Sequence, residues 1–279
     1  KDEPPDVFFC SEYTVQLGSA SAFSQTYSWS PVAGLDDPSI SDPILSLTNT
    51  GNTIDTIPYI VTVVNTLNSC ELSDTVLAIV YPEPTANAGG DISMCSADTV
   101  TIGSAPLAGY TYSWTPLTGM LDTTLANPQI THINMGTVPD TFTYVVTALD
   151  TAPNCFSSDT IIVIVNPYPI PNAGNDISFC SGSGDSLGTT NTPGYIYNWT
   201  PTAGLSNSSV ANPYLNLINS DTIVDTINYI VGTTIFNCTA FDTALVIVLP
   251  TPITDAGSDL HICSGYTDTL GSESINGYN

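Results

Sequence analysis

One pattern of residues occurs three times in this chain and begins a fourth time, at an almost constant spacing. Each complete copy has a cysteine, a glycine eight residues later and a tryptophan nineteen residues later. A proline follows two residues after the tryptophan, and another glycine follows three residues after that proline. The starting cysteines are Cys10, Cys95, Cys180 and Cys263. Self-similarity at a fixed period, here about 85 residues, is the signature of a tandem array.

The period divides the 279 residues into three units that are each large enough for one small β-sandwich, and a remainder. Stretches with alternating proline separate the units, at 81–85, 166–171 and 249–253. Proline cannot donate to a sheet ladder and has a fixed φ, so these stretches end a strand and form short, semi-rigid hinges. We predict repeat 1 at 1–85, repeat 2 at 86–170, repeat 3 at 171–253 and the start of a fourth repeat at 254–279.

The pattern within each repeat predicts β-strands, because Thr, Ser, Val, Ile and Tyr are abundant and apolar residues alternate with polar ones. Short strands, turn signals, a tryptophan on the third strand and paired cysteines predict an all-β chain of tandem immunoglobulin-like sandwiches. In repeat 2 we expect strands at 99–103 and 110–114, and loops with edge strands at 122–139. We expect one hairpin per repeat, at 56–63 with 74–80, 141–148 with 159–165, and 226–231 with 242–248.

Two kinds of aromatic residue recur at matching positions and are predicted to pack in the cores. The tryptophans are Trp29, Trp114 and Trp199, and the tyrosines are Tyr59, Tyr144 and Tyr229. For the tyrosines, a hydrogen bond at a corner of the sandwich is the alternative role.

Cysteine usage predicts disulfide bonds. In each repeat a second cysteine follows the first after about 60 residues, which is not a zinc-ligand spacing, and the chain has only two histidines. Disulfides in an oxidising compartment are therefore the better explanation. Closing one loop per repeat predicts the bonds Cys10–Cys70, Cys95–Cys155 and Cys180–Cys238. Cys263 is left unpaired, and its partner is expected about 60 residues further along a longer parent chain, or in another chain.

The charge balance excludes several partners. The chain has 26 acidic residues and a single basic one, Lys1, for a net charge of −25. Nothing can neutralise phosphates, so we expect no binding to nucleic acid or to an anionic membrane surface. No apolar run approaches the length of a membrane-spanning helix, so no membrane insertion is expected. We predict a solvated acidic surface and no cofactor, with Ca²⁺ binding as the alternative; the aspartate of the Ala-Gly-x-Asp turn after each hinge, such as Asp91, is the candidate ligand.

No set of residues suited to catalysis recurs. The histidines, His132 and His261, occupy unrelated repeat positions, so a Ser-His-Asp arrangement would require a coincidence. The carboxylate pair Asp36–Asp37 occurs in one repeat only, and glycine-rich phosphate loops are absent. We predict that the chain is not an enzyme.

The whole pattern, Ala-Asn-Ala-Gly-x-Asp, Cys-Ser, Leu-Gly, Tyr-x-Trp-Thr-Pro, Gly-Leu, Asn-Pro, Tyr-x-Val-Thr, Cys and Asp-Thr-Val, resembles the PKD-like or Ig-like repeats of large secreted surface proteins of Bacteroidetes bacteria. The resemblance covers essentially the whole chain. Repeat 1 departs from it by lacking Ala-Gly, and repeat 3 by a shorter segment before Cys238. It implies an adhesin or gliding-associated protein secreted to the bacterial surface, in which such repeats act as stalks, spacers or adhesive modules.

A tripeptide of Asp, then Thr or Ser, then usually a small or aliphatic residue recurs along the chain. An aspartate that closes a turn and a threonine that opens a strand explain it physically. The resemblance implies an alternative, because the O-glycosylation acceptor of such bacteria is similar to this tripeptide. The candidate acceptors are Thr56, Thr75, Thr99, Thr123, Thr151, Thr160, Ser186, Thr222, Thr226, Thr243 and Thr269.

These features predict a structural or adhesive segment of a long extracellular fibre or cell-surface stalk, cut from a longer chain, since no signal peptide is visible. The expected partners are neighbouring repeats and identical chains in a filament. The alternatives are a module that binds a glycan or another cell, and a non-catalytic spacer of a larger secreted enzyme. Aromatic residues exposed in the loops of one repeat but not its sisters would favour a binding module.

Overall fold

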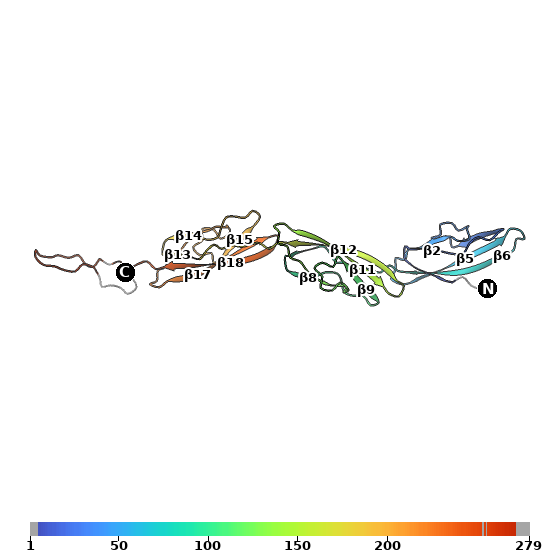
Figure 1. Ribbon diagram of the computed structural model, residues 1–279, viewed down its shortest axis with the longest axis horizontal. Helices are drawn as coiled ribbons and strands as arrows, with labels where there is room; N and C mark the ends of the chain where they lie inside the picture. Colours follow the sequence, from blue (N-terminus) through green and yellow to red (C-terminus); the bar gives the residue numbers. More distant parts are fainter. Residues whose placement is uncertain (1–4, 253, 255, 272–279) are drawn as a thin grey trace. The chain divides into compact units, whose positions relative to one another are not determined.

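The computed structural model describes residues 5–252, 254 and 256–271. This part of the chain forms β-strands and no helix (Figure 1). The chain divides into two compact units. The first comprises residues 1–134 and 139–165, and the second comprises 135–138 and 166–279.

The first unit contains two copies of one β-sandwich. The strands of the first copy are β1 (Val7–Cys10), β2 (Thr14–Gln16), β3 (Gln25–Ser30), β4 (Ile44–Ser46), β5 (Asp55–Asn65) and β6 (Glu71–Tyr81). Four of them form one sheet in the order β1-β6-β5-β3, and β2 pairs with β4 in a second sheet. Strand β1 runs parallel to β6, and the other pairs are antiparallel.

The second copy repeats this arrangement. Its strands are β7 (Ile92–Cys95), β8 (Thr99–Thr101), β9 (Tyr110–Thr115), β10 (Gln129–Thr131), β11 (Asp140–Asp150) and β12 (Cys155–Asn166). The sheets have the orders β7-β12-β11-β9 and β10-β8. The hairpin of β11 and β12 is longer than predicted, because its pairing continues to Asp150 opposite Cys155.

The second unit contains the third copy. Its strands are β13 (Ile177–Cys180), β14 (Gly184–Ser186), β15 (Ile196–Thr200), β16 (Tyr214–Asn216), β17 (Asp225–Ile235) and β18 (Cys238–Leu249). They form the sheets β13-β18-β17-β15 and β14-β16. After β18, the described residues 250–252, 254 and 256–271 form no strand.

The three copies have immunoglobulin-like topology. In each, the first strand pairs in the larger sheet with the last strand, and the second and fourth strands form the smaller sheet. The predicted fold class, a tandem array of Ig-like β-sandwiches, is confirmed. The predicted boundaries at 85/86 and 170/171 fall in stretches without strands, and we retain them as proposed domain limits.

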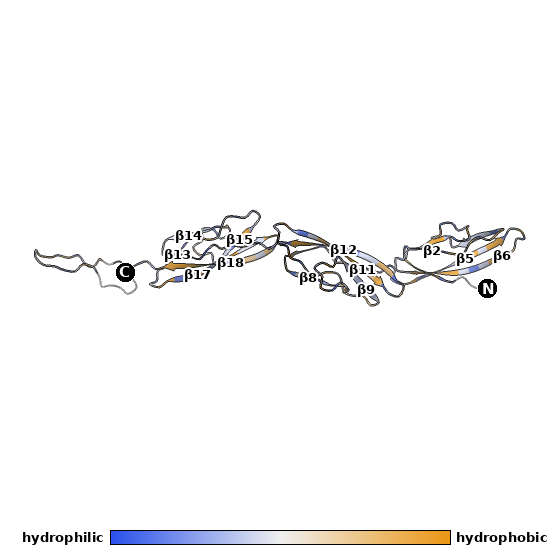
Figure 2. Cartoon of the chain, in the orientation of Figure 1, coloured by the Kyte–Doolittle hydropathy of each residue, from blue (hydrophilic) through white to orange (hydrophobic). Residues whose placement is uncertain are grey.

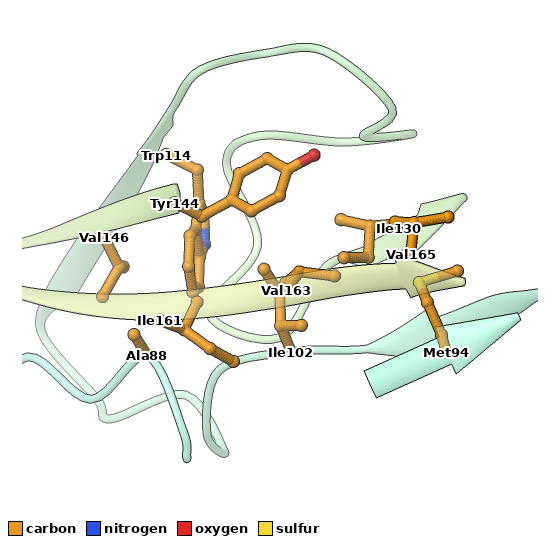
Figure 3. Packing of buried hydrophobic residues seen from close by; sticks show 10 residues of the cluster. All are labelled: Ala88, Met94, Ile102, Trp114, Ile130, Tyr144, Val146, Ile161, Val163 and Val165. Carbon is orange, nitrogen blue, oxygen red and sulfur yellow. The ribbon is translucent and has the colours of Figure 1, made fainter. Parts of the chain in front are cut away.

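Each copy encloses its own core between its two sheets. In repeat 2, Trp114 and Tyr144 pack with Val146, Ile161 and Val163 (Figure 3). The hydrophobic stretches of the chain lie along strands such as β6 and β12 (Figure 2). The six aromatic residues predicted for the cores are buried: Trp29, Trp114, Trp199, Tyr59, Tyr144 and Tyr229.

The buried aromatic residues also have hydrogen-bond partners for their polar atoms. The tryptophan Nε1 atoms donate, each at 2.9 Å, to the carbonyl oxygens of Ile40, Leu125 and Val210. The tyrosine hydroxyls donate to the carbonyl oxygens of Ala33, Thr118 and Ala203. Burial raises the pKa of each of these tyrosines. The tyrosines therefore combine the two roles considered above.

The fixed spacing from cysteine to glycine to tryptophan has a packing cause. Gly103 has a φ of +83°, and a Cβ atom there would lie 2.1 Å from the carbonyl oxygen of Ala126 and 2.9 Å from the Trp114 ring. Only glycine fits this position, because it tolerates the left-handed backbone and has no side chain. A cis peptide bond precedes the proline that follows each tryptophan, at Pro31, Pro116 and Pro201.

Candidate functional site: a disulfide-bonded junction between repeats

A disulfide bond joins Cys10 of repeat 1 to Cys155 of repeat 2, with their Cα atoms 5.6 Å apart. Cys10 is the last residue of β1, and Cys155 is the first residue of β12. The two cysteines are 145 residues apart in the sequence. The bond is therefore a cross-link between neighbouring repeats, and both partners lie within the first unit.

The bonds predicted inside repeats 1 and 2, Cys10–Cys70 and Cys95–Cys155, are wrong. Cys10 lies opposite Tyr81, the last residue of the 11-residue strand β6, whereas Cys70 comes just before the first residue of that strand. A strand of this length spans roughly 35 Å, but a disulfide requires Cα atoms within about 7 Å. The two cysteines of one repeat thus lie at opposite ends of their sandwich.

The same separation applies in repeat 3. Cys180 lies opposite Leu249, and Cys238 is at the other end of the 12-residue strand β18. The predicted bond Cys180–Cys238 is therefore also wrong. Cys95 and Cys238 are disulfide-bonded. The exposed free thiols are those of Cys70, Cys180 and Cys263.

Non-covalent contacts surround the bond between Cys10 and Cys155. The rings of Tyr13 and Phe156 pack edge to face, with centroids 6.4 Å apart. The Ser157 hydroxyl accepts a hydrogen bond from the Ala86 amide at 3.0 Å and donates one to the Pro84 carbonyl at 2.5 Å. The hinge, the tip of the β11–β12 hairpin and repeat 1 are thereby held together.

Carboxylates anchor the Ala-Gly-x-Asp turn that follows the hinge. The Ala88 amide donates to Asp159 Oδ2 at 2.8 Å, and the Ile162 amide donates to Asp91 Oδ1 at 2.8 Å. The Gly103 amide donates to the Ala88 carbonyl at 2.9 Å. The same three contacts recur in repeat 3, between Ala173 and Asp242, Leu245 and Asp176, and Gly188 and Ala173.

These contacts bear on the predicted alternative of a Ca²⁺ site. Asp91 is engaged by a backbone amide, and so are its counterparts Asp6 and Asp176. Within the described residues, no group of three or more His, Cys, Asp or Glu side chains is arranged to hold a metal ion. The turn aspartates are explained by their backbone hydrogen bonds.

His132 is a core residue of repeat 2. Its ring stacks on Phe142, with centroids 3.9 Å apart, and its Nε2 atom contacts the Tyr144 hydroxyl. Burial lowers its pKa. The matching positions of the sister repeats hold Leu47 and Leu217, so the histidine fills an apolar position. The other histidine, His261, is exposed.

A buried asparagine that was not among the predicted site residues recurs once per repeat, at Asn49, Asn134 and Asn219. Its side-chain amide donates to the carbonyl near the end of the last strand, that of Val80, Val165 or Val248. Its backbone amide donates to the serine hydroxyl of the Cys-Ser pair, that of Ser11, Ser96 or Ser181. This asparagine fixes the segment that presents the first cysteine of each repeat.

All the candidate O-glycosylation acceptors are at the surface. Thr123 is half-buried, and the others are exposed. Thr75, Thr160 and Thr243 occupy matching positions in β6, β12 and β18, pointing away from the cores.

Repeat 1 contains a pocket of about 300 Å³, lined by Gly18, Trp29 and Asp74 among others. In addition, Phe23 is 93% exposed in the loop between β2 and β3. The sister positions are Ala108 and Pro193, so this exposed aromatic ring is specific to repeat 1.

In the described part of the chain, no helix is long and apolar enough to cross a membrane. No protein-family model matches the chain, and no curated protein matches its sequence.

Several solved structures are similar to the chain. A mutated variant of titin domains I67–I69 shares 11% identity, with 90% of this chain and 97% of that one covered and a TM-score of 0.40. Three N-terminal domains of the Hoc protein of bacteriophage RB49 share 14% identity, with 88% and 96% covered and a TM-score of 0.40. Extracellular domains 3–5 of Drosophila OTK share 8% identity, with 87% and 94% covered and a TM-score of 0.34. Because these sequence identities and TM-scores are low, the assignment of the Ig-like fold rests on the strand order of the chain itself.

Proposed function

We propose that this chain is a structural segment of a long extracellular fibre or cell-surface stalk, built from Ig-like repeats that are covalently linked in series. The observation that carries this proposal is the bond between Cys10 and Cys155. A disulfide inside a domain stabilises that domain alone, whereas this one resists the separation of two domains. Resistance to separation is what a stalk requires to hold a distal site away from a cell.

Cys10 and Cys155 are the first cysteine of one repeat and the second cysteine of the next. Neighbouring repeats of the same chain are thus the primary partners in this proposal.

The composition fits this role. Disulfide bonds and an Ig-like fold fit an extracellular protein. A net charge of −25 keeps a long array soluble and opposes non-specific contact with nucleic acid. The resemblance to secreted Bacteroidetes repeats supports a bacterial cell surface, in an adhesin or a gliding-associated protein.

Electron microscopy tests the proposal. Antibodies against this segment, with gold labels, should mark fibres outside intact cells of the source organism. Small-angle scattering of the purified chain should show an elongated particle, as expected for three sandwiches in a row. Label confined to the cell interior, or scattering from a compact globule, would contradict the proposed role.

One observation favours a second candidate, a module that binds a glycan or another cell. Phe23 meets the criterion set by the sequence, since it is exposed in a loop of repeat 1 and has no aromatic counterpart in the sisters. An exposed aromatic ring is a common anchor of binding surfaces. Binding on a glycan array that is lost in Phe23→Ala but kept in Leu67→Ala, another exposed apolar residue of repeat 1, would support this candidate. Equal signals for the two variants would exclude it.

A further inference from the structure

A groove of about 590 Å³ lies beside the disulfide bond that joins repeats 1 and 2. This volume is within the range of about 300–1,000 Å³ that is typical of ligand clefts. Two glutamates and two aromatic residues are among those that line it: Glu12, Glu83, Tyr13 and Phe156. We propose that the groove binds an arginine side chain of a partner protein. The inference goes beyond the fibre role, which requires no ligand at the junction.

Three segments of the first unit line the groove. The turn after β1 provides Glu12 and Tyr13. The hinge provides Glu83, and the start of β12 provides Phe156. The disulfide bond between Cys10 and Cys155 fixes the first of these segments against the third. The groove is therefore largely preformed, which lowers the entropic cost of binding a ligand.

The glutamates make the groove attractive to a cation. Glu12 and Glu83 are both exposed, in a chain that has 26 acidic residues and one basic residue. The described residues include no lysine or arginine, so neither type of side chain neutralises these carboxylates from within them. A net charge of −25 also attracts cationic ligands over a distance. An anionic partner would be repelled.

The aromatic rings favour arginine among the cations. Tyr13 is 48% exposed and Phe156 is 51% exposed, and their rings pack edge to face with an angle of 76° between the planes. In such a pair, the ring that presents its edge keeps its own faces clear of the other ring. A guanidinium group stacks on a ring face and donates paired hydrogen bonds to a carboxylate, whereas an ammonium group is a compact point charge.

The fold itself does not require these four residues. The sister residues are Asp98 and Ser183 for Tyr13, Glu71 and Thr239 for Phe156, Ala97 and Gly182 for Glu12, and Tyr168 and Thr251 for Glu83. The combination of two rings with two carboxylates is thus specific to the groove between repeats 1 and 2. Exposed aromatic residues that the sister repeats lack are the sequence criterion for a binding module.

A nuclear magnetic resonance titration of the full chain tests the proposal, with a capped Gly-Gly-Arg-Gly-Gly peptide as the probe. The peptide should shift the backbone amide signals of Glu12, Tyr13 and Phe156, and binding should weaken with added salt, which screens the charges. The same peptide with citrulline in place of arginine keeps the shape without the charge, and it should cause no such shifts. A capped Gly-Gly-Lys-Gly-Gly peptide should bind more weakly than the arginine peptide.

Charge variants separate the groove from the general field of the protein. Glu83→Gln should weaken binding of the arginine peptide by about two- to fivefold, as expected for an exposed charge pair. Glu71→Gln is the matched control, because it removes the same charge at the start of β6, whereas Glu83 follows the end of that strand. The affinity of this control should stay close to that of the wild type.

Ring variants test the stacking contact at constant net charge. Tyr13→Ser and Phe156→Thr each install the residue of repeat 3, so both variants are expected to fold. Each should weaken binding by about two- to fivefold, as expected for the loss of an exposed cation–π contact.

Three results would overturn the proposal. One is binding of the citrulline or the lysine peptide that is as tight as that of the arginine peptide. Another is an equal loss of affinity in Glu83→Gln and Glu71→Gln, which indicates attraction to the overall charge. The third is a response of the same amides to neutral maltohexaose and not to the arginine peptide. Each of these results would leave the proposed fibre role intact, since labelled fibres outside cells do not depend on this groove.

Discussion

The backbone amide of Ala88 donates a 2.8 Å hydrogen bond to the carboxylate of Asp159. The chain that enters repeat 2 is thus held by the strand that leaves the same repeat. Repeat 3 has the same contact between Ala173 and Asp242, also at 2.8 Å. This interaction accounts for the recurring aspartate at 159 and 242, and the full burial of Ala88 and Ala173 accounts for the recurring alanine.

Replacing Asp159 with alanine should therefore loosen the start of repeat 2. A hydrogen bond to a charged group contributes about 1.5–3 kcal/mol, so hydrogen exchange at the Ala88 amide should accelerate by about one to two orders of magnitude. Asp74→Ala is the matched control, because it removes the equivalent carboxylate of repeat 1 and leaves the bond between Ala88 and Asp159 in place. Unchanged exchange at Ala88 in Asp159→Ala would show that the contact contributes little.

Reduction of the bond between Cys10 and Cys155 should destabilise the first unit. A bond that closes a loop of this length is expected to contribute about 5 kcal/mol through the entropy of the unfolded chain. Calorimetry of Cys10→Ser should show a lower unfolding temperature for this unit, whereas Cys70→Ser should leave it unchanged, since Cys70 is unbonded. Non-reducing peptide mapping checks the pairing directly. A peptide that joins Cys10 to Cys70 would contradict the structure.

Gly103→Ala should be one of the most damaging single substitutions in repeat 2. The left-handed φ costs a residue with a side chain about 1–2 kcal/mol, and overlap with the Ala126 carbonyl adds about 1–3 kcal/mol. Gly109→Ala separates the two effects, because Gly109 has a similar φ of +87° but no atom within 4 Å of the added Cβ. Urea unfolding should show the larger loss for Gly103→Ala. Equal losses would mean that only the backbone conformation matters.

Acid should weaken repeat 2 through His132. Burial lowers its pKa in the folded state below the ordinary value of 6.5, so the unfolded chain binds the proton more readily. The contribution of the neutral ring is complete above about pH 7. It is lost progressively as the pH falls through 6.5 towards the folded-state pKa.

The matched variant for this effect is His132→Leu, which installs the residue of both sister repeats. Thermal unfolding of the wild type between pH 7 and pH 5 should show a loss of stability that this variant lacks. If the two proteins respond to pH in parallel, His132 is not the source of the acid sensitivity.

Glycosylation of the Asp-Thr tripeptides stays a prediction, and we propose that Thr75, Thr160 and Thr243 are modified together. They are exposed at one shared strand position, so an enzyme that recognises one of them meets the same surroundings at the others. Intact mass measured on protein from its own source should exceed the sequence mass, with sugar on these three peptides. A mass equal to that of the bare sequence would exclude the modification.

The fold class and the aromatic cores could be predicted because they depend on short-range pattern. The alternation of Tyr110, Tyr112 and Trp114 indicates a strand with one buried face. The constant distance from Gly103 to Trp114 reflects direct contact between the two residues. Such signals recur in each copy, because the same residue types pack together in the core of every repeat.

The pairing of the cysteines could not be predicted in this way. If the second cysteine of every bond belongs to the next repeat instead of the same one, the period of the pattern is unchanged. Spacing alone therefore does not distinguish bonds within a repeat from bonds between repeats. The parallel pairing of β1 with β6 decides the matter, because it places Cys10 beside Tyr81, far from Cys70. Asn49 was missed for a different reason. It lies in the segment between the glycine turn and the hairpin, whose composition varies between copies, although its recurrence at a constant spacing at Asn134 and Asn219 was visible in the sequence.

The bond from Cys10 to Cys155 also has a mechanical consequence. When the chain is pulled from its ends, the force passes through the sulfur–sulfur bond, and the residues between the two cysteines carry no tension. An extended chain reaches about 3.3–3.6 Å per residue, so roughly 500 Å of contour length between the cysteines stays unextended even after both sandwiches unfold. A domain that opens under load stays beside its neighbour and can refold there, while the distance spanned by the pair changes little.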